Sequence, residues 1–146
     1  MRTSEATATI PRPAHTVFAT INDHTSVAAW MEYHPALTVT SDGAKGVGTT
    51  LRYEFTQGGR VNTMEGAVTA FEADRRLTMR FDDPAFAVTV EFLLTTRPNG
   101  TELRHAIGIE PKRFLGRLMA PLIRAGNDRQ VRRNLERLSL LLTSAA

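Results

Sequence analysis

Apolar and polar residues alternate through most of the first two thirds of the chain, and a two-residue period of this kind predicts β-strands. Turn residues separate the runs, most clearly Gln57-Gly58-Gly59-Arg60 and Pro98-Asn99-Gly100, and they predict hairpins. The alternation slips at Glu65-Gly66, which predicts a β-bulge there. The runs occupy residues 3–10, 36–43, 47–56, 61–73, 76–83, 86–96 and 101–110.

Apolar residues recur every three or four positions elsewhere, which predicts helices. Residues 14–23 and 24–33 form two short helical segments between the first and second strands, with Asp23 as a cap and Pro35 beyond the second. Pro111 fits the first position of a long helix that extends to the C-terminus. Two apolar stripes mark this helix: Leu115, Leu118, Met119 and Leu122, then Val131, Leu135, Leu138 and Leu142.

The two stripes of the last helix fall on opposite sides when each residue turns the helix by about 100°. A straight helix could not bury both stripes against one sheet. Pro121 can kink a helix, and Gly126-Asn127-Asp128 offers both a stop and a new cap. We therefore predict a break or strong bend between Pro121 and Asp128. The later half should pack on the sheet, and the earlier half should form a flap over a cavity mouth or a contact surface.

The order of elements indicates the fold class. Hairpin turns join the later strands without crossover helices, so the sheet should be antiparallel and the class α+β. The prediction is a curved sheet of about seven strands wrapped round a long C-terminal helix, with two short helices between strands 1 and 2. A chain of 146 residues without a linker or repeat predicts a single domain over residues 1–146.

Composition narrows the classes of function. The chain is 42% hydrophobic and 23% charged, typical of a soluble globular protein, and it has no cysteine for a disulfide or a thiolate zinc site. No run approaches the roughly 18 apolar residues of a membrane span, and the first residues lack the apolar region of a secretory signal. We expect a cytoplasmic location. The four histidines lack metal-ligand spacing and no dinucleotide motif occurs, so neither metal nor cofactor is predicted.

Positive charge is concentrated at the C-terminal end. Only Asp128 and Glu136 oppose eight basic residues after Pro111, although the net charge of the chain is +3. This segment is either a solvated face or a contact for an acidic protein or a peripheral membrane surface. Its basic residues do not interleave with aromatic ones, so nucleic acid is not an expected partner. The sequence is compatible with a monomer and with a homodimer. The eight are Lys112, Arg113, Arg117, Arg124, Arg129, Arg132, Arg133 and Arg137.

Several local patterns resemble the START-like helix-grip superfamily (SRPBCC), and its polyketide cyclase/dehydrase-like branch in particular. The superfamily also includes lipid-transfer START domains and the birch-pollen-allergen group. The resemblance implies a seven-stranded sheet that curls round the C-terminal helix and leaves an apolar cavity between them. The patterns are Ile10-Pro11-Arg12-Pro13 before Val17-Phe18, Asp23 seven residues before Trp30, Gly66–Phe71 before Arg75-Arg76-Leu77, and Arg133–Leu138.

The inward faces of these elements would supply an apolar wall, which suits a hydrophobic ligand. The same residues could equally fill a core. Trp30 and Tyr33 would lie near a mouth, and Leu118, Met119 and Leu122 would close the cavity from the helix. The strand candidates are Tyr53, Phe55, Met79, Phe81, Phe86, Val88, Phe92, His105 and Ile107.

His105 is the most informative polar candidate, because its strand phase between Leu103 and Ile107 aims it inward. It could act as a general acid/base or orient a ligand, or it could be a hydrogen-bonded interior histidine without a chemical role. Glu65 could assist if the bulge turned it inward, and Tyr53 could donate a hydrogen bond. The strand arginines Arg52, Arg80 and Arg104 fall in the outward phase, which weakens the enzyme hypothesis.

Three functions follow from these patterns. The first is a binder or carrier of a small hydrophobic molecule, such as a lipid, a quinone or a polyketide-like compound. The second is a cyclase or dehydratase that uses His105. The third is an interaction module that uses the basic C-terminal helix.

Overall fold

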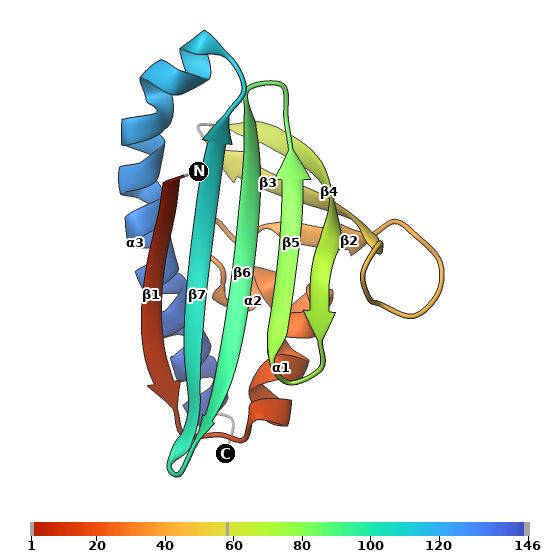
Figure 1. Ribbon diagram of the computed structural model, residues 1–146, viewed down its shortest axis with the longest axis vertical. Coiled ribbons are helices and arrows are strands. Elements are labelled where there is room, and N and C mark those ends of the chain that lie inside the picture. The colour runs from red at the N-terminus through yellow and green to blue at the C-terminus, as the bar shows by residue number, and fades with distance from the viewer. Residues whose placement is uncertain (1, 58, 145–146) are drawn as a thin grey trace.

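The computed structural model describes residues 2–57 and 59–144. Seven strands form one antiparallel sheet in the order β1-β7-β6-β5-β4-β3-β2, and two short helices and a 3₁₀ turn follow β1 (Figure 1). The predicted α+β fold is therefore confirmed. The elements are β1 (Arg2–Ile10), α1 (Ala14–Asn22), η1 (His24–Ser26), α2 (Val27–Trp30), β2 (Ala36–Val39), β3 (Thr50–Gln57), β4 (Arg60–Glu72), β5 (Arg76–Asp82), β6 (Phe86–Arg97), β7 (Gly100–Pro111) and α3 (Phe114–Ser144).

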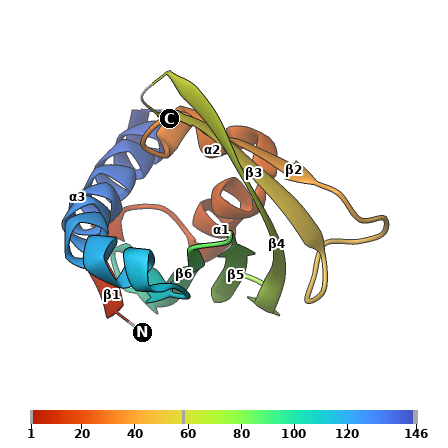
Figure 2. The ribbon, with the colours of Figure 1, turned by 90° about the horizontal axis from the view of Figure 1, so that it is seen from above.

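The sheet curls so that its two edges lie on opposite sides of the molecule. Strand β1 pairs with β7 at one edge and lies beside α3, whereas β2 pairs with β3 at the other. Seen from above, β3 and β4 curve over α1 and α2, and α3 lies on the far side of these two helices (Figure 2). The helices thus fill the concave side of the sheet.

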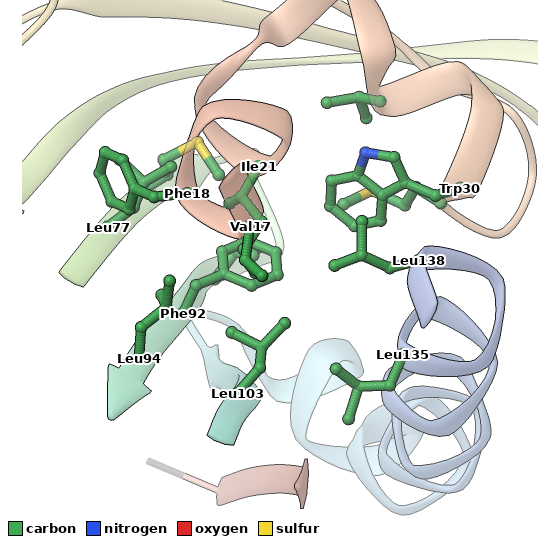
Figure 3. Close-up of a cluster of buried hydrophobic side chains, with 14 of the residues drawn as sticks. Val17, Phe18, Ile21, Trp30, Leu77, Phe92, Leu94, Leu103, Leu135 and Leu138 are labelled. Atoms are coloured by element: carbon green, nitrogen blue, oxygen red, sulfur yellow. The ribbon is translucent and has the colours of Figure 1, made fainter. Parts of the chain in front are cut away.

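The main core lies between α1, α2, the central strands and the second half of α3. Val17, Phe18 and Ile21 form the buried face of α1, as their spacing predicts. Figure 3 shows Trp30 of α2 facing Leu138 of α3, with strand side chains completing the cluster. The Trp30 and Phe92 rings meet edge to face at 5.7 Å, an arrangement that aromatic quadrupoles favour.

Gly66 lies in regular strand pairing, so the predicted bulge at Glu65-Gly66 is wrong. Gly66 is opposite Leu51 on one side and Phe81 on the other, and the register shifts instead between Val68 and Ala70. A Cβ at Gly66 would stand 2.5 Å from Cδ1 of Phe81. The alternation slips there because glycine leaves space that the Phe81 ring occupies, and the neighbouring residues keep their faces.

Helix α3 runs without interruption from Phe114 to Ser144, with Pro121 inside it. The predicted break between Pro121 and Asp128 is therefore wrong, whereas the strong bend given as its alternative stays a prediction. Pro111 ends β7 instead of starting the helix. The chain resolves the conflict between the two stripes by leaving three residues of the first one exposed, and the side chain of Leu115 lies outside the described part of the structure. Leu118, Met119 and Leu122 are 64%, 43% and 74% exposed. The second stripe is buried, as predicted: Val131, Leu135, Leu138 and Leu142.

Candidate ligand-binding cavity

A small enclosed cavity lies between the sheet and the α1–α2 segment. Its volume is about 10 Å³, and its walls come from α1, α2, the residue after α2, and strands β2, β3, β5 and β6. None of its lining residues lies on α3, so the cavity is displaced from the predicted place between sheet and C-terminal helix. The ten lining residues are Ile21, Val27, Trp30, Met31, Leu37, Tyr53, Met79, Phe81, Val90 and Phe92.

Half of this wall was predictable and half was not. Trp30, Tyr53, Met79, Phe81 and Phe92 were expected from strand phase and from the resemblance. The other five come mainly from the helical segment and from the short edge strand, whose packing depends on tertiary folding. Two of these five residues had a signal in the sequence: the phase of β6 places Val90 on the face of Phe92, and helical spacing places Ile21 on the buried side of α1.

The remaining predicted lining residues lie elsewhere. Leu118, Met119 and Leu122 were expected to close the cavity, and their exposure on α3 contradicts that expectation. Five other predicted residues lie outside the wall, because the cavity occupies only the part of the interior under α2 and β2. Ile107 is buried elsewhere, and the other four are partly buried: Tyr33, Phe55, Phe86 and Val88.

The cavity wall is apolar almost throughout. Its two polar groups are already used: Trp30 Nε1 donates to Ser26 Oγ at 3.2 Å, and the Tyr53 hydroxyl lies 3.5 Å from Met31 Sδ. Burial raises the pKa of Tyr53 well above its usual range, so the phenol stays neutral. A wall without charge favours an apolar ligand over an ionic one.

His105 is fully buried and bonded through both ring nitrogens. The backbone N–H of Glu32 donates to Asn134 Oδ1 at 2.9 Å, which fixes the orientation of this amide. Asn134 Nδ2 then donates to Nε2 of His105 at 3.0 Å. Nδ1 must therefore carry the proton, which it donates to the carbonyl oxygen of Glu91 at 3.2 Å.

This environment keeps His105 neutral. Burial lowers its pKa from 6.5 to about 4, although the bond to the Glu91 carbonyl opposes the shift. The ring stacks on Phe92 with centroids 4.3 Å apart. His105 thus points inward, as its phase predicts, but it is not part of the cavity wall. With both nitrogens bonded to the protein, the geometry supports a structural role for it.

Glu65 lies on the outer face of the sheet. Its carboxylate is 61% exposed and accepts a hydrogen bond from Nε of Arg52 at 2.8 Å. Because the strand is regular at Gly66, nothing turns this side chain inward, and the suggested assistance to His105 is wrong. Arg52, Arg80 and Arg104 also point outward, as predicted, where they form exposed ion pairs with carboxylates.

The segment after α2 is fastened to the second half of α3 by polar contacts. Arg137 Nη1 donates to the carbonyl of Met31 at 3.4 Å, and Arg129 Nη2 donates to the Tyr33 hydroxyl at 3.2 Å. The Glu32 carboxylate lies 3.6 Å from Nε of Arg129. Tyr33 and His34 adopt positive φ angles of 70° and 47°, which are uncommon for residues other than glycine. Sequence reasoning missed these contacts because the partners are about a hundred positions apart.

The sequence matches a protein family over residues 1–142, and the family is described as polyketide cyclase / dehydrase and lipid transport. The chain belongs to this family. A search of curated proteins finds no match. Family membership and the helix-grip architecture together support a ligand-binding fold.

Solved structures share the fold of this polyketide cyclase-like chain. The protein TTHA0849 from Thermus thermophilus is 15% identical, with a TM-score of 0.79 and 99% of each chain covered. The Zhui aromatase/cyclase from a Streptomyces species is 16% identical, with a TM-score of 0.76 and coverage of 99% of this chain and 98% of that one. Ara h 8.0201 is 14% identical, with a TM-score of 0.68 and 98% of each chain covered.

Within the described ranges, no helix combines the length and the apolarity that crossing a bilayer requires.

Proposed function

We propose that this protein binds and carries a small hydrophobic molecule, such as a lipid, a quinone or a polyketide-like compound, in the cavity beneath α1 and α2. The observation that carries the proposal is the wall itself: ten apolar or aromatic side chains from six elements and the residue after α2 converge without a charged group. Membership of a family described by polyketide cyclisation and lipid transport supports the same conclusion.

The cavity must enlarge when it takes a ligand, because about 10 Å³ holds no more than one water molecule. Two methionines, Met31 and Met79, belong to the wall, and their unbranched side chains adapt readily to new shapes. Glu32 and Tyr33, between α2 and β2, are held to α3 by polar contacts of 2.9–4.0 Å. Water can replace such contacts, so these residues can move while Trp30 and Met31 stay buried in the core. Movement of this segment is therefore the entry route that we propose.

A bulky substitution at the cavity should block binding. Leu37→Trp on β2 places an indole where the ligand would lie, and we expect the affinity for the uncharged fluorescent probe N-phenyl-1-naphthylamine to fall about tenfold or more. The matched control is Thr38→Trp on the same short strand, which is exposed and lies outside the wall and should change affinity less than about twofold. Fluorescence titration and native mass spectrometry of the purified protein measure both.

Equal affinity in the wild-type protein and in Leu37→Trp would contradict the proposal, as would the absence of probe binding and of any co-purified apolar molecule. Circular dichroism checks that Leu37→Trp is folded. If it is not, Val90→Leu in the central part of the wall supplies a milder test, with an expected loss of about threefold.

A further inference from the structure

The first turns of α3 expose a row of large apolar side chains. Phe114, Leu118 and Leu122 follow one another at intervals of four, so they lie along one side of the helix. Phe114 is 73% exposed, similar to the two leucines, and Met119 lies beside them. We call these four residues the apolar row. Figure 1 places this part of α3 at one end of the molecule, beyond the start of β1.

The opposite side of the same turns is packed against the sheet. A Cβ added to Gly116 would stand 2.9 Å from the carbonyl oxygen of Ala85 and 3.2 Å from the Phe86 ring, so the helix backbone lies directly on the β5–β6 connection. Ala120, one turn later, is also buried. Small residues thus already pack this part of the helix against the rest of the protein, and the apolar row faces away from that contact.

Arginines border the apolar row on one flank. Arg113, Arg117 and Arg124 are exposed, and none of them forms an ion pair with the described part of the chain. No aspartate or glutamate occurs between Lys112 and Asn127. Of the carboxylates near this end, Asp82 pairs with Lys112 at 2.8 Å and Glu110 lies 3.9 Å from Arg80. Three positive charges are therefore available to meet an anionic partner.

We propose that the first turns of α3 form a docking surface for an anionic lipid bilayer. The helix lies parallel to the membrane, with the apolar row at the boundary between headgroups and acyl chains and the three arginines at the lipid phosphates. The apolar row matches the acyl-chain layer of such a surface, and the three arginines beside it match the layer of lipid phosphates. The surface lies outside the cavity, so this inference does not depend on the proposed function.

Vesicle co-sedimentation tests the docking surface. The wild-type protein should bind vesicles that contain phosphatidylglycerol, bind pure phosphatidylcholine vesicles much more weakly, and dissociate as salt rises. Leu118→Ser with Leu122→Ser should weaken partitioning about tenfold or more. Arg117→Gln with Arg124→Gln should weaken it by about the same factor. Leu140→Ser and Arg132→Gln alter an exposed leucine and an exposed arginine farther along α3 and should have little effect.

The variants should keep their fold, because both leucines are already exposed, and unchanged thermal melting verifies this. Because the chain has no cysteine, a single label at Leu118→Cys gives a second measurement, and its fluorescence should shift to the blue on anionic vesicles. Vesicle binding that does not depend on salt concentration or on phosphatidylglycerol content would overturn the proposal. So would leucine variants that bind vesicles as strongly as the wild-type protein. Capture by polyglutamate without vesicle binding would overturn it in favour of an acidic protein.

Discussion

Replacement of Asn134 by alanine is expected to lower the free energy of unfolding by about 3 kcal/mol. The substitution removes the partner of two buried groups, Nε2 of His105 and the backbone N–H of Glu32. A buried polar group without a partner costs about 1–3 kcal/mol, and the Asn134 side chain is fully buried. Urea denaturation of the wild-type protein and the variant measures the loss.

Asn127→Ala is the matched control, because Asn127 is half-buried on the same helix and lies outside this chain of bonds. It should change stability by less than about 0.5 kcal/mol. A loss at Asn134 as small as this would show that the His105–Asn134–Glu32 connection contributes nothing to the fold. A double-mutant cycle with His105→Ala should give substantially less than additive losses, because the two residues share one bond.

Acid should destabilise the fold through His105. Its pKa is about 4 in the folded protein against an ordinary 6.5, so between these values the unfolded chain binds a proton that the folded protein does not. Stability from this residue is complete above pH 6.5 and is lost progressively as the pH falls towards 4. The full loss of stability is about 3 kcal/mol, because each unit of pKa difference between the folded and unfolded states contributes about 1.36 kcal/mol. Urea denaturation at a series of pH values measures it.

His105→Gln isolates this contribution, because glutamine cannot titrate and the carboxylates titrate in both proteins. The difference in stability between wild type and variant should shrink steadily between pH 6.5 and about 4. Parallel pH profiles for the two proteins would mean that His105 does not titrate on unfolding in the way its burial requires.

The strands could be predicted closely from the sequence because their large apolar side chains alternate along the chain and share one face. The alternation of Leu77, Met79 and Phe81 against polar neighbours follows directly from that geometry, and all three are buried in β5. His105 was placed inward for the same reason. Glu65-Gly66 misled the prediction, because a missing side chain resembles a change of phase when only one strand is considered.

The last helix and the cavity were harder to predict, for a different physical reason. The apolar stripe that contains Leu118 and Leu122 was assumed to be buried, and this assumption forced a break that the continuous helix does not have. Burial of an apolar stripe is a tendency of folded chains, and a stripe left exposed is informative. Asn134 and its bonds join residues that are distant in sequence, so no local pattern reveals them.

The central claim is that an apolar ligand occupies the cavity beneath α1 and α2. Its most direct test is a methyl-resolved NMR titration with the uncharged probe. The account predicts intermolecular contacts from the probe to the methyl groups of Ile21, Val27 and Leu37. The methyl groups of Leu140, exposed on the outside of α3, should show none. Contacts confined to exposed leucines on α3, with no change at the three cavity residues, would contradict it.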